Sequence, residues 1–201
     1  MKQAIKTRCY ECGAETEGRR ENYRYVESGL SSVVLTNVLV FRCKRCGAVV
    51  PQITAAAVLH LRIAMHLLTK ETRLSGEEVR FLRKAVGYSA TELAKMLGTS
   101  KAVVSRWENY STLGQESDRL VRLICVNKML GDRLLNADRS RIDEKDIQRA
   151  QELVASMDDT LRKLRKKKSH KKEQYMIDPA DLSDYGCITG ADAELDALRV
   201  Q

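Results

Sequence analysis

The chain has 201 residues, enough for one medium domain or two small ones. Hydrophobic residues make up 43% of it and aromatic residues only 5%, so any core must be mainly aliphatic. No apolar run approaches the roughly eighteen residues of a membrane span, and the N-terminal MKQAIKTRCYECG lacks the apolar stretch of a secretory signal peptide. These features predict a cytoplasmic protein without a membrane segment.

The charge is basic and unevenly distributed. The formal net charge is +8. Residues 162–172 hold eight Lys and Arg side chains, whereas residues 173–201 hold seven acidic side chains and the single Arg199. The part of the chain before residue 162 therefore keeps a positive net charge of its own. A basic chain of this kind favours a polyanionic partner such as nucleic acid.

Two Cys-x-x-Cys-Gly units bound the first 50 residues. Their cysteines are Cys9, Cys12, Cys43 and Cys46. The segments YRYVES and SSVVLTNVLVFRC between them are typical of strands, with Gly29 and Asn37 as candidate turn positions. Two residues between thiolates let a tight turn aim both sulfurs at one ion, and four thiolates close a tetrahedral shell. Residues 1–50 are therefore predicted to be a β module that holds one structural Zn²⁺.

The other cysteines and the histidines are weaker ligand candidates. In a reducing cytosol, cysteines serve as metal ligands or buried hydrophobes rather than as disulfides. A redox dithiol or unrelated buried cysteines are the alternatives, and two matched units argue against both. Cys125 lies in the apolar VRLICV and is predicted to be core, while Cys187 has no partner in sequence. His60 and His66 are not needed as ligands because four thiolates already complete a site.

Helical patterns fill the middle of the chain. Pro51 opens the Ala- and Leu-rich stretch that is predicted to form a connecting helix within residues 51–72. Residues 73–131 then carry two capping boxes, a glycine helix stop at Gly98 and a further helix at about residues 116–130. The capping boxes are Ser75 with Glu78 and Ser89 with Glu92. The predicted fold is therefore mainly α, with a small N-terminal β zinc-binding module.

The two short helices on either side of Gly98 have the spacing of a helix-turn-helix. Ala94 is small enough for two helices to approach at about a right angle, and Val104 and Trp107 anchor the second helix to the core. This second helix would enter the major groove with its N-terminus first. Four of its residues would then face outward. They are Lys101, Ala102, Ser105 and Arg106.

These outward residues are predicted to read bases. Arg106 can donate a bidentate pair to guanine, Lys101 can reach guanine or phosphate, and Ala102 can contact a thymine methyl. At the start of the helix, Thr99 and Ser100 can hold phosphate with hydroxyl and backbone N–H groups. The alternative is a surface helix whose Lys and Arg are merely solvated, and the agreement of helix caps with the small–Gly–apolar spacing argues against it.

The segment GEEVRFLRKAVGYSATELAKMLGTSKAVVSRWEN resembles the XRE (Cro/repressor-like) helix-turn-helix family. Together with CYECG and CKRCG it resembles the MqsA/YgiT-type antitoxins over roughly residues 5–130. The resemblance implies a helix-turn-helix domain of about five helices, a homodimer, a palindromic double-stranded DNA operator and autorepression. It also implies a zinc domain that binds and neutralises a toxin protein.

The resemblance assigns roles by position. Lys101, Ala102 and Arg106 match base-reading positions. Phosphate contacts match Thr99, Ser100 and Asn109, and a recurrent ion pair between the first helix and the recognition helix matches Arg83 and Glu108. Two positions depart from the family. Ala90 stands where many relatives place a phosphate-binding glutamine, and Ala102 replaces a polar base-reading residue, so the operator sequence cannot be carried over.

The remainder of the chain has no counterpart in that family. Residues 132–165 are predicted to be a helical extension, and residues 166–201 a Lys-rich and then acidic flexible tail. The leading interpretation is a transcriptional repressor of the antitoxin type. The alternative is a protein resembling bridging factors that recruit transcription or translation machinery. An enzyme is not expected, because the sequence offers neither a Ser/His/Asp set nor a phosphate-cradling glycine loop.

Overall fold

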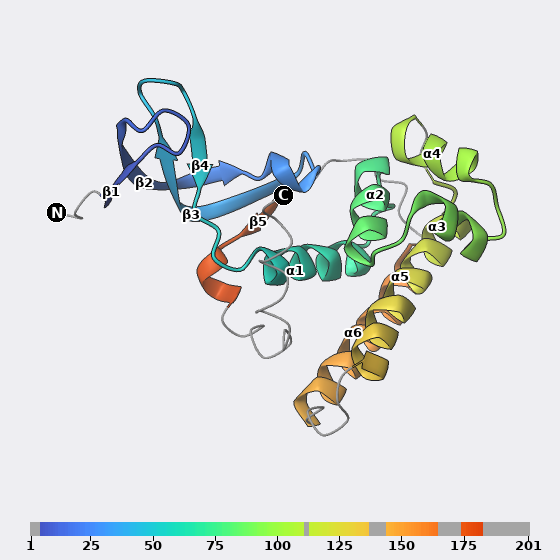
Figure 1. The fold of residues 1–201 in the computed structure, drawn as a ribbon. Helices are drawn as coiled ribbons and strands as arrows, with labels where there is room; N and C mark the ends of the chain where they lie inside the picture. Colours follow the sequence, from blue (N-terminus) through green and yellow to red (C-terminus); the bar gives the residue numbers. More distant parts are fainter. Residues whose placement is uncertain (1–4, 111–112, 137–143, 165–173, 183–201) are drawn as a thin grey trace. The chain divides into compact units, whose positions relative to one another are not determined.

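The computed structural model describes residues 5–110, 113–136, 144–164 and 174–182 (Figure 1). The chain divides into two compact units. The sheet unit comprises residues 1–59 and 173–201, and the helical unit comprises residues 60–172. The predicted fold class, mainly helical with a small N-terminal sheet that carries four cysteines, is confirmed.

The sheet unit is built on antiparallel neighbours in the order β1-β2-β3-β4. The strands are β1 (Ile5–Arg8), β2 (Glu15–Arg24), β3 (Val33–Arg42), β4 (Val49–Pro51) and β5 (Tyr175–Ile177). A single turn of 3-10 helix (Val26–Ser28) and Gly29, with φ +74°, connect β2 to β3. The two long strands form the centre of the sheet, and their apolar side chains, including Tyr23, Leu35 and Val40, are buried.

Asn37 does not form the predicted turn. It lies inside β3 with φ +55°, where the register of β2 against β3 shifts between Glu21 and Tyr23. Asparagine tolerates this left-handed conformation, and Arg20 Nη1 donates to the Asn37 carbonyl at 2.8 Å. The segment is therefore one long irregular strand rather than two strands joined by a turn.

The expectation of a flexible tail over residues 166–201 is wrong for residues 174–182. Here β5 pairs in parallel with Val33–Leu35 of β3, along the part of the edge that β4 leaves open because it pairs only with Val40–Arg42. Ile177 and Leu182 are buried. A three-residue strand carries no usable periodicity, so β5 could not be predicted from the sequence. The predictions for the rest of the tail, including Cys187, lie outside the described residues.

In the described part of the chain, six helices lie between β4 and β5. They are α1 (Ala56–Thr69), α2 (Gly76–Ala85), α3 (Ala90–Met96), α4 (Lys101–Asn109), α5 (Gln115–Asn136) and α6 (Glu144–Lys163). Both predicted capping boxes are present, and Gly98 has φ +62° after α3. Pro51 does not begin a helix; it ends β4, a short edge strand, where its missing N–H is tolerated.

The helical unit packs around a buried arginine. Arg122 on α5 is fully buried and its Nε donates to Asp118 Oδ2 at 3.0 Å. Its other nitrogens donate to four backbone carbonyls, those of Leu67, Leu68, Lys70 and Thr72. Asp118 Oδ1 accepts from the backbone N–H of Leu74 at 2.7 Å. The last turn of α1 is thus tied to α5, and α1 joins α2–α5 as the fifth helix of the domain.

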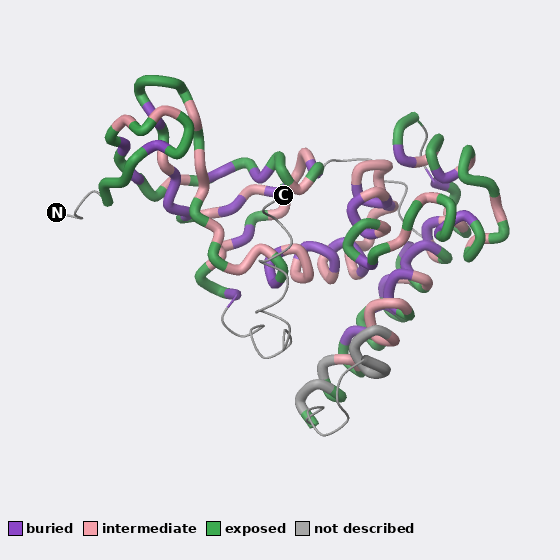
Figure 2. The backbone as a smooth tube through the Cα atoms, viewed as in Figure 1, coloured by how far each residue is buried: buried purple, intermediate pink, exposed green. Residues whose placement is uncertain are grey.

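The extension after α5 is part of the same unit. Thr160 Oγ1 on α6 donates to the Thr69 carbonyl at 2.8 Å, and Lys163 Nζ lies 3.3 Å from a Glu71 carboxylate oxygen. Leu153, Met157 and Leu164 are buried (Figure 2). Among the described helices, none has an apolar stretch long enough to cross a membrane.

Substitution of Gly76 tests how closely α2 approaches α4. A Cβ at this position would lie 2.4 Å from the Trp107 carbonyl oxygen and 2.8 Å from that of Glu108. Because both are backbone atoms at the end of α4, Gly76→Ala is expected to destabilise the helical unit by about 1–3 kcal/mol. Gly131→Ala, where a Cβ meets nothing within 4 Å, serves as the control. Chemical denaturation measures both, and equal stability of the two variants would contradict the close approach.

Candidate metal centre and nucleic-acid interface

The two cysteine units form matching turns. In the first, the Cys9 N–H donates to the Ala14 carbonyl and the Gly13 N–H to the Cys9 carbonyl. In the second, the Cys43 N–H donates to the Ala48 carbonyl and the Gly47 N–H to the Cys43 carbonyl. Both glycines take positive φ, +70° at Gly13 and +76° at Gly47, as only glycine does without cost. The repeated geometry presents each pair of thiols in the same way.

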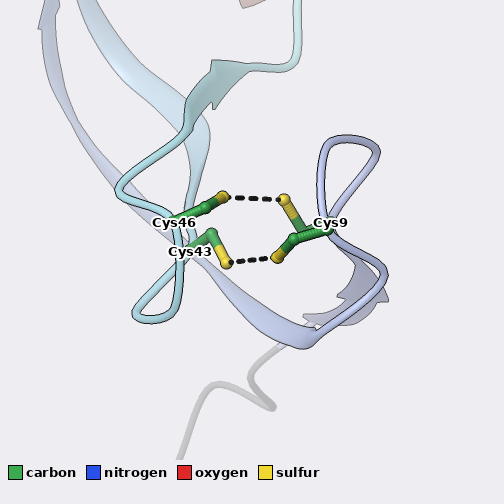
Figure 3. A group of neighbouring side chains, drawn as sticks. Cys9, Cys43 and Cys46 are labelled. Atoms are coloured by element: carbon green, nitrogen blue, oxygen red, sulfur yellow. Dashed lines mark hydrogen bonds between the residues drawn. The ribbon is translucent and has the colours of Figure 1, made fainter.

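The strand register brings the two turns together. The first turn precedes β2 and the second follows β3, and Glu17 near the start of β2 pairs with Arg42 at the end of β3. The four sulfurs consequently lie within 4.8 Å of one another. Cys9 Sγ is 3.6 Å from Cys46 Sγ, and Cys12 Sγ is 3.5 Å from Cys43 Sγ (Figure 3). The 30 residues between Cys12 and Cys43 include the antiparallel pair β2–β3, which brings the two units together.

The donor set fits a tetrahedral metal ion such as Zn²⁺. Four Zn–S bonds of about 2.3 Å place neighbouring sulfurs about 3.8 Å apart, close to the contacts seen here. The backbone N–H groups of Cys46 and Arg45 lower the pKa of Cys43 to about 6. At Cys46 an N–H bond from Ala48 acts to lower the pKa, but desolvation of the sulfur and the neighbouring cysteines raise it to about 12. Four crowded thiols cannot all ionise without a cation among them.

The helix-turn-helix forms where the sequence predicts it. Leu93 and Ala94 on α3 and Val104 on α4 form a buried cluster, with Trp107 packed against it. The Thr99 N–H donates to the Ala94 carbonyl at 2.9 Å, which closes the turn between the helices. Ser100 caps α4 by accepting from the Val103 N–H. The small residue, the glycine turn and the apolar anchor therefore set the position of α4.

The residues predicted to read bases lie on one exposed side of α4. Lys101, Ala102, Ser105 and Arg106 are all exposed. Of the residues predicted to bind phosphate, Ser100 is exposed and Thr99 is half-buried. Ala90, which stands where many members of the resembled family place a glutamine, packs partly buried against the Leu93 cluster. Its methyl group has no hydrogen-bonding capacity, so a phosphate contact by this side chain is absent.

An ion pair clamps α2 to α4. Arg83 Nε donates to Glu108 Oε1 at 2.6 Å and Arg83 Nη2 donates to Glu108 Oε2 at 3.0 Å. A third bond from Arg83 Nη1 reaches the Tyr88 carbonyl at 2.8 Å. The Glu108 side chain is only 6% exposed, so this bidentate pair is shielded from solvent screening. It fixes the C-terminal half of α4 relative to α2.

Arg80 is a further contact that the sequence reasoning missed. Its Nε lies 3.4 Å from Glu108 Oε2, and its Nη2 donates to the Glu108 carbonyl at 3.2 Å and to Asn109 Oδ1 at 2.5 Å. Asn109 Nδ2 in turn donates to the Ser105 carbonyl at 2.7 Å. Asn109 was expected to contact phosphate, and here both ends of its amide are engaged by the protein. Arg80 lies three residues before Arg83, the helical spacing that could have indicated a shared target.

Comparison with known proteins matches the helix-turn-helix region. Residues 79–116 match a family model described as Helix-turn-helix. Over 36 residues the chain is 56% identical to a putative HTH-type transcriptional regulatory protein of Pyrococcus furiosus. That match covers 18% of this chain and 11% of the relative, so the chain spans only a small part of the relative's length. No solved structure matches the chain.

Fold, site and family match together define the class of the molecule. It contains a helix-turn-helix domain, and its N-terminal sheet carries a four-cysteine cluster suited to a metal ion. The match spans α3 and α4 and includes both residues of the Arg83–Glu108 pair.

Removal of one thiol tests the metal centre. Cys12→Ser is expected to lower metal content to near zero and to unfold the two turns, because three thiolates hold the ion far more weakly. Cys125→Ala removes a thiol buried in α5 and should leave the metal content unchanged. Elemental analysis and the thiolate charge-transfer absorption of the Co²⁺-loaded protein measure both variants. Full metal retention in Cys12→Ser would rule out a four-sulfur site.

Proposed function

We propose that the chain is a sequence-specific DNA-binding transcriptional repressor that binds a palindromic operator as a homodimer. The observation that carries this proposal is the exposed face of α4, where Lys101, Ala102, Ser105 and Arg106 are presented by a clamped helix. The family match over residues 79–116 supports double-stranded DNA as the partner.

The residues proposed to contact DNA divide into those that face the bases and those that face the phosphate backbone. Arg106 suits a bidentate contact with guanine, Lys101 a guanine or a phosphate, and Ala102 a thymine methyl. At the start of α4, Ser100 keeps its hydroxyl proton while its oxygen caps the helix, so it can donate to a phosphate together with Thr99. Asn109 is the remaining phosphate candidate. It would contact phosphate through the exposed part of its side-chain amide that Arg80 and the Ser105 carbonyl do not engage.

The four cysteines are proposed to hold one structural Zn²⁺ per chain. Cys9, Cys12, Cys43 and Cys46 would fill all four tetrahedral positions, which leaves none for a substrate or an activated water. When bound, the ion supplies a cross-link between the two turns. We therefore assign the chain a binding role and no catalytic activity.

A second copy of the chain is needed to read a palindrome, because each α4 reaches only one half-site. Leu120 and Leu123 on α5 are 48% and 47% exposed, which is high for leucine side chains one turn apart. They support α5 as part of the dimer contact. Half-sites about one helical turn apart follow from this arrangement.

Operator binding is tested by fluorescence anisotropy near 0.15 M salt, with DNA from upstream of the coding sequence against scrambled DNA. A preference of at least about a thousandfold is expected. Arg106→Ala should weaken operator binding by about 1–3 kcal/mol and relax specificity at one base pair per half-site. Arg24→Ala, which removes an exposed arginine from β2, is the charge-matched control. Equal, salt-sensitive binding to both DNAs would instead favour the bridging-factor-like alternative.

The narrower form of the proposal is an autoregulating antitoxin of a type II toxin–antitoxin system. The succession of a four-cysteine sheet module and a helix-turn-helix domain supports it. The N-terminal module would then bind the toxin protein. Co-expression with each adjacent gene product tests this idea: a toxin should arrest growth alone and be neutralised by the full chain. The Arg106→Ala variant should still neutralise it, and the absence of any toxic neighbour would contradict the antitoxin role.

A further inference from the structure

Three sides of α5 are covered by neighbours in the helical unit. On one side, Arg122 donates to carbonyls at the end of α1. On another, Arg119 Nη2 donates to the Leu161 carbonyl of α6 at 2.8 Å. On the third, Ile124 packs against the buried cluster that α3 and α4 share. These neighbours leave one side of α5 open to solvent.

The open side carries four exposed residues, which we call the α5 stripe: Glu116, Leu120, Leu123 and Asn127. Their spacings of four, three and four residues align them along one side of a helix with 3.6 residues per turn. The two leucines at the middle of the stripe lie one turn apart, and burying them would remove apolar surface from water. A carboxylate ends the stripe on one side and a carboxamide ends it on the other.

The spacing of the α5 stripe is the same in both directions along the helix. In a two-fold-symmetric interface, residue i of one copy contacts residue j of the other, and j contacts i. If two α5 helices pair antiparallel about an axis between Leu120 and Leu123, each Leu120 meets Leu123 of the second copy. Each Glu116 then meets Asn127 of the second copy, and every one of these contacts is made twice.

The polar ends of the stripe favour this antiparallel pairing over a parallel one. Glu116 and Asn127 are eleven residues apart in the sequence, about 16 Å along the helix, so each can contact only the residue directly opposite. In the antiparallel pair, the Asn127 amide can donate to the Glu116 carboxylate. In a parallel pair, Glu116 would face Glu116 of the second copy, and the two like charges would repel.

We propose that a second copy of the chain docks on the α5 stripe in antiparallel orientation, with Glu116 and Asn127 of opposite copies forming the pairs that set this orientation. The inference rests on the homodimer of the proposed function and specifies the surface and the geometry that hold it. The two leucines supply the apolar contact, and the polar pairs discriminate against the parallel alternative.

Sedimentation equilibrium of the full-length protein, without DNA, tests the contact itself. Leu123→Glu places a carboxylate beside the two-fold axis, next to Leu120 of the second copy, and is expected to raise the dimer dissociation constant at least about tenfold. Met96→Glu is the matched control, because it adds the same charge at a side chain of α3 that is 55% exposed. It should keep the dissociation constant within about twofold of the wild-type value. Thermal midpoints establish that both variants are folded.

A charge-exchange cycle tests the orientation. Asn127→Asp sets a carboxylate opposite Glu116 and is expected to weaken the dimer about threefold to tenfold, since the repulsion occurs twice. Adding Glu116→Lys to that variant should restore wild-type affinity, because the introduced ammonium group would face the introduced carboxylate. In a parallel pair the same addition would weaken the dimer further, because each introduced group would face its own copy. Gln151→Glu, which adds a negative charge at an exposed position of α6, should not weaken the dimer.

A dimer that persists in Leu123→Glu would overturn the inference, and so would further weakening when Glu116→Lys is added to Asn127→Asp. A wild type that is monomeric both alone and on operator DNA would overturn it as well. Operator recognition is measured separately, by the comparison of Arg106→Ala with the wild type on DNA. If the wild type does not prefer operator over scrambled DNA while the α5 stripe variants behave as expected, the repressor proposal fails and the dimer contact stands.

Discussion

The helical unit depends on the buried interaction between Arg122 and Asp118. Desolvation lowers the pKa of Arg122 and the charge of Asp118 opposes that shift. Arg122 keeps its positive charge, as arginine does in proteins. Four carbonyls at and after the end of α1 accept its remaining N–H groups, at the negative end of that helix dipole. Loss of the arginine would leave Asp118 buried and unpaired, a change that typically costs about 3–5 kcal/mol.

The position of α4 follows from this interaction step by step. Asp118 holds the backbone of Leu74, and the next residue, Ser75, is the N-cap of α2. The first residue of α2, Gly76, lies so close to the end of α4 that a Cβ there would overlap the Trp107 carbonyl oxygen. One and two turns further along, α2 presents Arg80 and Arg83 to Glu108. The orientation of α4 therefore depends on the buried Arg122–Asp118 pair on α5.

The features of the fold that could be predicted are those encoded by short-range sequence patterns. The capping boxes, the Gly98 turn and the two cysteine units are encoded by neighbouring residues, and the structure forms all of them. The contacts that were not predicted join segments that are far apart in the sequence. The Arg122 interactions reach carbonyls 50 to 55 residues away, and Arg80 reaches Asn109 across 29 residues. The strand β5 pairs with β3 from the other end of the chain. Backbone carbonyls and short edge strands leave no residue-type signature, so the contacts of Arg122 and of β5 cannot be predicted from one sequence.

The two units are stabilised by different chemistry. Among the four antiparallel strands of the sheet unit, the inner strands β2 and β3 carry the buried side chains, whereas all four residues of β1 are exposed and β4 is only partly covered. Burial alone therefore holds the outer strands weakly. A metal ion between the β1–β2 and β3–β4 turns would join both outer strands to the inner pair, and its binding energy would be folding energy of this unit. The helical unit has its own apolar core and the Arg122 pair. Metal loss should accordingly loosen the outer strands first and leave the helix-turn-helix folded.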